Sequence, residues 1–374
     1  MRHRILPSRL LPLLTSAFML LAGAGVGVVA QQPQQPGPVT SEELLRLVRE
    51  LPKRPSLREE IIREVRARGI NFPLTSGIRS LVATRSGNDA DLRRALEEAE
   101  RRFRDPELAA PPSETEAAAL LEKSRGATRE AADGMPDFVV KQLILRALAY
   151  GATKNFVPQD RLVVGVSYRA GAGEKYRLLA KNGIPLASAE EKGNYVEAGG
   201  SSSTGEFVTI LSLLFADESK TEFKAVGADT LRGRRTIIYE YAVKLPHSKH
   251  RLSYSGDREG RTRDEVVVGT RGRLWIDREN ARVLRVESVA TDIPSSFPIT
   301  ATTNTVDYEW VNIPGQGEYL LPSRAVMDMS FLRRTELLQT RNDIRFRGYQ
   351  KYGTDVKIIE EDIIDEEPPA EKKP

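Results

Sequence analysis

The spacing of apolar positions divides this 374-residue chain into a helical first part and a strand-rich second part. In residues 41–104, apolar side chains recur three or four positions apart, which predicts short amphipathic helices. From Met135 to Gly353, apolar and polar residues alternate instead, as they do in Ile237–Lys244. This alternation predicts antiparallel strands with one apolar face and one face toward water.

Capping boxes predict where several helices begin, because a serine is followed three residues later by a glutamate that can cap the same turn. The three pairs are Ser56 with Glu59, Ser113 with Glu116, and Ser203 with Glu206. The second pair opens a long helix that leads into the strands. The third opens an inserted helix over Glu206–Ala216, whose apolar residues share one face: Phe207, Ile210, Leu211, Leu214 and Phe215.

Short, turn-like links rich in glycine and asparagine join about ten or eleven predicted strands, and an antiparallel sheet of that size curls. The inserted apolar helix then belongs in the concavity, where it covers the apolar face of the sheet. The sequence therefore predicts an α+β fold. It consists of a curled antiparallel sheet, an incomplete β-barrel, with the inserted helix in its concavity and a small α-helical domain before it.

The N-terminus has the pattern of an export signal, with three early arginines, the apolar run Leu10–Leu21 and small residues up to Ala30. Cleavage after Ala30 is the prediction, and retention as a membrane anchor is the alternative. We expect an exported protein, periplasmic or extracellular, with no stable transmembrane span after cleavage. The predicted organisation is a signal peptide (1–30), a disordered linker (31–40), a small helical domain (41–104), a linker (105–112), the half-barrel domain (113–354) and an acidic disordered tail (355–374).

Composition argues against most catalytic chemistry. The chain has no cysteine and three histidines, of which only His247 and His250 lie beyond the signal. A metal site needs three or four fixed donors, and a serine nucleophile needs a base within hydrogen-bond reach. We therefore expect no catalytic residues, no metal and no cofactor. The formal net charge of +4 is too small to predict a nucleic-acid partner.

Many arginines fall within three predicted hairpins. If they converge, they form a basic patch for anionic head groups, and otherwise they are the polar side of alternating strands. The core of this patch would be Arg232, Arg234, Arg235, Arg251, Arg271 and Arg273.

A second candidate site is an apolar cavity between the sheet and the inserted helix. The loop Ile293–Ile299 is either a lid over that cavity or part of the core, with Ile293, Phe297 and Ile299 as its apolar residues. The residues expected to line the cavity are Tyr168, Phe207, Ile210, Leu211, Leu214, Tyr239, Tyr241, Met327 and Phe346, with Tyr254 and Met329 on the same face.

Several motifs resemble those of the outer-membrane lipoprotein-sorting (LolA/LolB-like) fold. The segment Leu274–Leu284 begins with a Trp-Ile-Asp turn similar to that of these carriers. The segments Ser203–Phe207, Asp307-Tyr308 and Leu321-Pro322 are similar to motifs of uncharacterised exported bacterial proteins. The resemblance covers about residues 113–354. It implies an incomplete barrel with helices in its open mouth and a cavity for acyl chains, and it implies binding without a reaction.

Three functions follow from these observations. The first is a non-catalytic periplasmic or secreted protein that holds a lipid or another apolar ligand in the half-barrel. The second is an envelope interaction or structural module with a filled core, which meets a protein partner through residues 41–104. The third is a hydrolase of unknown substrate.

Overall fold

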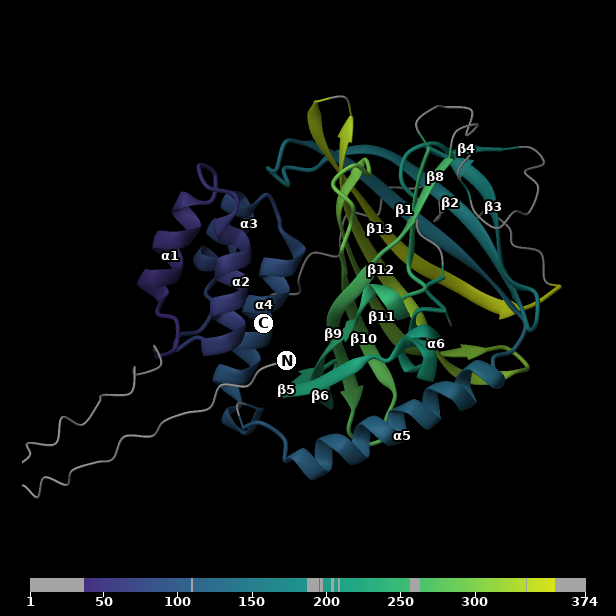
Figure 1. Cartoon of the computed structure of the whole chain (residues 1–374), viewed down its shortest axis with the longest axis horizontal. Helices are drawn as coiled ribbons and strands as arrows, with labels where there is room; N and C mark the ends of the chain where they lie inside the picture. Colours follow the sequence, from purple (N-terminus) through teal and green to yellow (C-terminus); the bar gives the residue numbers. More distant parts are fainter. Residues whose placement is uncertain are drawn as a thin grey trace, which may run out of the picture. The chain divides into compact units, whose positions relative to one another are not determined.

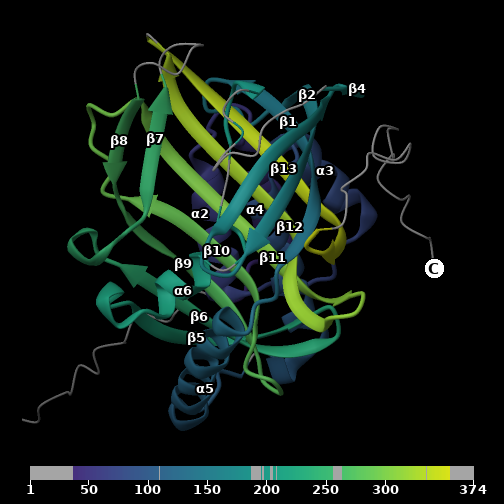
Figure 2. The same ribbon diagram turned by 90° about the vertical axis from the view of Figure 1, so that its right-hand side faces the viewer.

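Among the described residues, eleven strands form one antiparallel sheet whose edge strands do not pair with each other (Figures 1 and 2). Consecutive neighbours in the sheet are β4 (Ile184–Pro185), β3 (Gly173–Lys181), β2 (Val157–Arg169), β1 (Phe138–Tyr150), β13 (Glu336–Lys351), β12 (Gly317–Arg333), β11 (Ile299–Ile313), β10 (Val283–Thr291), β9 (Gly269–Asp277), β6 (Arg234–Val243) and β5 (Glu222–Leu231). The predicted fold class is confirmed. The sheet curls without closing, as expected for an antiparallel sheet of this size.

The computed structural model describes residues 37–108, 110–186, 195, 198–202, 205–207, 209–255, 263–333 and 335–353. The predicted signal peptide (1–30) and acidic tail (355–374) lie outside the described residues, as does Ser203. In the described part, no helix is both long and apolar enough to span a membrane.

The predicted helical first part contains α1 (Ser41–Glu50), α2 (Leu57–Arg68), α3 (Ser76–Ser86) and α4 (Ala90–Arg104), which we call the helical prefix. These helices have an apolar core of their own, which includes Leu44, Ile61, Val82 and Leu92. Figures 1 and 2 place them on one side of the sheet, opposite α5 and α6.

Local hydrogen bonds explain where these helices begin. Asp89 caps α4 by accepting a hydrogen bond from the Leu92 N–H. The expected cap at Ser56 is wrong, because Ser56 already has helical backbone angles and its side chain makes no capping bond. The linker predicted for residues 31–40 also ends too late. Val39 is buried and exchanges backbone hydrogen bonds with Gly69 and Asn71, so its neighbourhood belongs to the helical prefix.

Two helices cover the concave face of the sheet. The longer, α5 (Glu114–Asp133), begins as predicted, since the Ser113 hydroxyl accepts a hydrogen bond from the Glu116 N–H. The shorter, α6 (Thr209–Phe215), begins three residues later than the predicted Glu206. Gly205 has a positive φ, and the Glu174 carboxylate accepts a hydrogen bond from its N–H, so residues 205–207 form a turn instead of the first helical turn.

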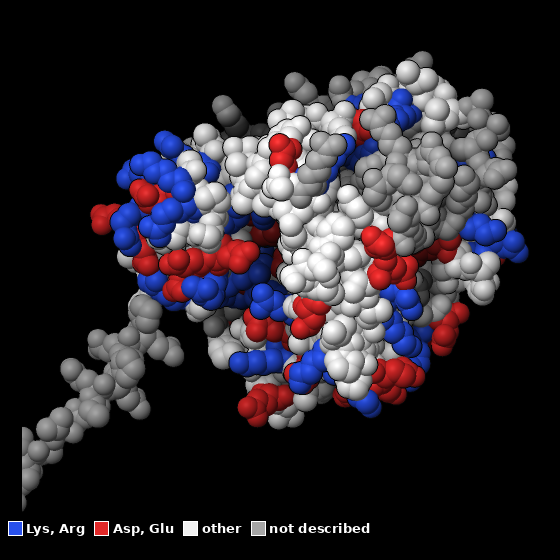
Figure 3. Space-filling view, turned by 45° about the horizontal axis from the view of Figure 1, so that its top comes forward, with Lys and Arg blue, Asp and Glu red and all other residues white. Residues whose placement is uncertain are grey.

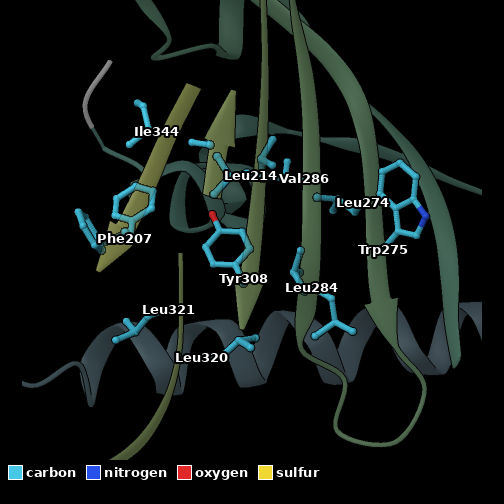
Figure 4. Close-up of a cluster of buried hydrophobic side chains, with 14 of the residues drawn as sticks. Phe207, Leu214, Leu274, Trp275, Leu284, Val286, Tyr308, Leu320, Leu321 and Ile344 are labelled. Carbon is cyan, nitrogen blue, oxygen red and sulfur yellow. The ribbon is translucent and has the colours of Figure 1, made fainter. Parts of the chain in front are cut away.

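The main apolar core lies between the concave face and these two helices. Figure 4 shows side chains from several strands that converge there with Phe207 and Leu214. A smaller hairpin, β7 (Arg251–Ser255) with β8 (Arg263–Val267), forms a separate two-stranded sheet.

Candidate functional site

The candidate site is the apolar concave face together with the segment that fills it. Of the expected cavity residues, Phe207, Leu214, Tyr239, Tyr241 and Phe346 are buried in the main core. Tyr168, Ile210 and Leu211 are half-buried and pack against it. Met327 is buried outside the main core, and Tyr254 and Met329 belong to a satellite cluster.

The space between helix and sheet is almost completely filled. A cavity of about 30 Å³ remains, which we call the core cavity. A single water takes about that share of liquid volume. Its lining comes from α5, α6 and the sheet and includes Ala132, Leu211, Val283, Tyr308 and Leu320. In this conformation, therefore, the protein has no room for an acyl chain beside α6.

Residues 205–207, which we call the leader segment, tie α6 to the sheet by polar contacts. The Tyr308 hydroxyl donates to the Glu206 carbonyl at 3.1 Å. The Glu174 carboxylate accepts from the Gly205 N–H at 3.0 Å and also bonds the Tyr176 hydroxyl. Burial raises the pKa of Glu174, and it raises the pKa of Tyr176 further from its ordinary value.

Aromatic packing completes the attachment of the leader segment. The Phe207 ring lies 5.3 Å from the ring centroids of both Phe138 and Phe346. The side chain of Glu206 is fully buried. Every described residue of the leader segment therefore contacts the concave face or its polar groups.

A second polar group, on β1 and β13, holds residues 198–202 across the same face. Arg146 makes a bidentate ion pair with Asp160, with both N–O distances 2.6 Å, and donates to the carbonyls of Ala198 and Gly199. Asn342 donates to the Ser201 carbonyl at 3.0 Å.

Gln142 lies on the same face of β1, between Val140 and Ile144 of the apolar core. It is fully buried, and neither side-chain amide atom has a hydrogen-bond partner in the described part of the chain. Sequence reasoning missed Gln142 and Arg146. In Phe138–Tyr150 they alternate with the outward-facing residues in the same way as Val140 and Ile144, whose side chains point inward. Polar residues at such inward positions were the sequence signal that could have identified them.

The arginines of the expected basic patch do not form one cationic surface. Arg273 is buried beneath α4 and is paired with Glu98 at 2.8 and 3.0 Å. Arg271 lies exposed on β9. The other four each pair with an acidic side chain: Arg232 with Asp307, Arg234 with Asp277, Arg235 with Glu107 and Arg251 with Glu265. Figure 3 accordingly shows both signs of charge interspersed on the face it displays.

The residues of the expected lid pack into a satellite core. Ile293, Phe297 and Ile299 cluster with Leu252 of β7 and with Val268. None of the three lines the core cavity. Among the described residues, no group of three or more histidine or acidic side chains is arranged to hold a metal.

No family model and no curated protein matches the chain. Solved structures do match. A LolA superfamily protein from Nitrosomonas europaea shares 13% identity over 67% of this chain and 97% of its own, with a TM-score of 0.24. A putative outer membrane lipoprotein-sorting protein domain from Vibrio parahaemolyticus shares 12% over 64% and 95%, with a TM-score of 0.28.

A DUF1329 family protein from Desulfovibrio piger shares 9% identity over 63% of this chain and 95% of its own, with a TM-score of 0.27. The first two structures carry the name of the group that the sequence motifs resemble. At these identities and TM-scores, the likeness says nothing about what this chain binds.

Proposed function

We propose that this chain is a non-catalytic, exported binding protein that holds an acyl-type apolar ligand against the concave face of its sheet. In the unliganded protein, α6 and the leader segment occupy that place, and the ligand displaces them. The observation that carries this proposal is how weakly the segment covering the concave face is attached to it. The seven-residue helix α6 covers part of this face, beside α5, and a few polar contacts attach its leader segment.

The free energy lost when α6 leaves the concave face is similar to the free energy gained when an acyl chain is buried there. Burying Phe207, Leu214 and Phe215 stabilises the closed form by roughly 1.5–3 kcal/mol each, and the half-buried Leu211 adds less. An acyl chain of about sixteen carbons gains roughly 0.8 kcal/mol per buried methylene, or about 10 kcal/mol in total. An isolated helix as short as α6 is not stable in water, so the displaced segment would unfold into a flexible chain.

The polar groups beside the core could bind the polar head group of such a ligand. Gln142 offers a buried amide with both of its atoms uncommitted among the described residues. Asn342 and Arg146 lie on the same face and now bind the carbonyls of residues 198–202. A carboxyl or ester head group would replace these carbonyls as the acceptor.

The test compares two tyrosines with the same chemistry. Tyr308→Phe removes the hydroxyl that holds the Glu206 carbonyl. The closed form should weaken by about 1 kcal/mol, which raises the apparent affinity for a fluorescent long-chain fatty acid about fivefold. Tyr241→Phe is the control, because its hydroxyl donates to the Glu287 carbonyl at the same 3.1 Å but within the sheet. Equal affinities for the two variants, or no binding by either, would refute the displacement model.

One observation favours the interaction module instead: the core cavity measures only about 30 Å³. If the core is permanently filled, neither tyrosine variant binds the fatty acid. In that case the helical prefix, with its ion pairs to the sheet, is the surface to test by crosslinking in the cell envelope.

A further inference from the structure

A second cavity lies outside the concave face, where the helical prefix meets the turn between β1 and β2. It measures about 570 Å³, within the size range of small-molecule sites. We call it the junction cavity. It is lined by Leu51, Pro52, Pro55, Arg58, Gly77, Ser80, Leu81, Thr84, Arg85, Thr153 and Asn155.

One face of α3 forms a wall of this cavity. Gly77, Ser80, Leu81, Thr84 and Arg85 recur three to four positions apart, which places them on one side of the helix. The opposite wall is the β1–β2 turn. The two walls are in close contact, since a Cβ added at Gly87 would lie 2.5 Å from the Asn155 Oδ1.

The charge of the lining is positive. Arg58 and Arg85 both line the cavity, and no aspartate or glutamate does. Ser80, Thr84 and Asn155 add hydroxyl and amide donors, whereas the Thr153 hydroxyl already donates to the Tyr150 carbonyl. Leu51 and Leu81, with two prolines, supply the apolar part that ligand sites usually have.

Arg58 is fixed in position before any ligand arrives. Its side chain is 7% exposed, and its Nη2 donates to the carbonyls of Ser86 and Thr153, both at 3.3 Å. Its Nε lies 3.2 Å from the Asp89 carboxylate. Within the described residues these contacts use Nη2 and Nε, which leaves Nη1 for a ligand.

Asp89, the carboxylate beside Arg58, is shared with a second cation. The Lys154 ammonium lies 2.7 Å from the same carboxylate oxygen. Burial alone would raise the pKa of Asp89, but Lys154 and Arg58 outweigh it and hold that pKa below its ordinary value. Lys154 also lies 3.7 Å from Asp91, so two carboxylates stand behind these two cations, and the positive charge that faces the cavity comes from Arg58 and Arg85.

From this geometry we infer that the junction cavity binds a small ligand with an oxyanion group, a carboxylate or a phosphate, between Arg58 and Arg85. Guanidinium groups bind both oxyanions through paired, charge-assisted hydrogen bonds. Such a ligand also links the helical prefix to the sheet, because its two walls come from α3 and from the β1–β2 turn.

Calorimetric titration of the exported chain with inorganic phosphate and, separately, with succinate tests this inference and identifies which oxyanion the site takes. We expect at least one of them to bind. Arg85→Ala should weaken that binding about tenfold, because it removes a charge-assisted contact from an exposed residue that has no ion pair in the described part. Ser80→Trp should weaken it by narrowing the cavity.

Arg63→Ala is the matched control. Arg63 is 69% exposed on α2, and it does not line the cavity. It should leave the affinity unchanged, and thermal melts should show that all three variants are folded. The inference is overturned if neither anion binds, if Ser80→Trp binds as tightly as the wild type, or if Arg63→Ala weakens binding as much as Arg85→Ala does.

Discussion

The substitution Glu287→Gln tests how much ion pairs between the helical prefix and the sheet stabilise this fold. It removes one carboxylate from that contact. Glu287 lies on β10. Its two oxygens bind Arg66 of α2 at 2.7 Å and Arg94 of α4 at 3.1 Å. Its side chain is 11% exposed, so water screens these pairs only weakly. The glutamine keeps the size of the side chain and removes its charge.

The magnitude follows from the pKa of this carboxyl group. Burial alone would raise it, but Arg66, Arg94 and other arginines lower it from 4.5 to about 2. That difference corresponds to roughly 3 kcal/mol of stability. Because the folded-state pKa is depressed, this contribution is complete above about pH 5 and is lost as the pH falls toward 2.

The assay is urea unfolding of the wild type and the variant between pH 7 and pH 2. At pH 7 the variant should be about 3 kcal/mol less stable, because the half-buried Arg66 and Arg94 each lose one of their carboxylate partners. The gap between the two proteins should close as the pH falls toward 2. Glu279→Gln is the control, since Glu279 is 81% exposed and should matter by less than about 1 kcal/mol. A gap that stays constant with pH, or one below about 1 kcal/mol at pH 7, would refute the reasoning.

Two further changes test local features of the fold. Gly272→Ala should destabilise the sheet by several kcal/mol and reduce soluble expression, because a methyl group there would lie 2.7 Å from the Tyr241 hydroxyl and would collide with the Glu287 carbonyl. Ser113→Ala should lower the free energy of unfolding by about 1 kcal/mol, because the hydroxyl that accepts from the Glu116 N–H at the start of α5 is lost; Ser113→Thr, which keeps a hydroxyl, should recover most of the loss.

The curled sheet was predictable because its signal is local. Alternation along each strand and short turns fix antiparallel neighbours, and the apolar run of α6 has one place to be buried. The cap at Ser113 was predicted for the same reason, since Ser113 and Glu116 are close in sequence. The filled core was not predictable, because the volume left between α6 and the strands depends on side-chain packing over the whole concavity.

The prediction also took the outer face of the sheet to be entirely wet, and this is wrong. Ile238 and Trp275 are buried on that face, next to the inward Ile237 and Leu274. The Trp275 indole N–H donates to Asp229, which in turn pairs with Arg101 of α4. Consecutive apolar residues in these strands indicated that both faces were covered. The residues that cover this outer face could not be predicted from the spacing of apolar positions, since they lie far away in the sequence.

Hydrogen exchange of the amides in residues 205–216, with and without a long-chain fatty acid, tests the central claim most directly. If the ligand takes the place of α6, these amides should exchange faster when the fatty acid is bound, while those of the central strands should slow. Unchanged or slower exchange in 205–216 at saturating fatty acid would contradict displacement and leave the concave face a permanently closed core.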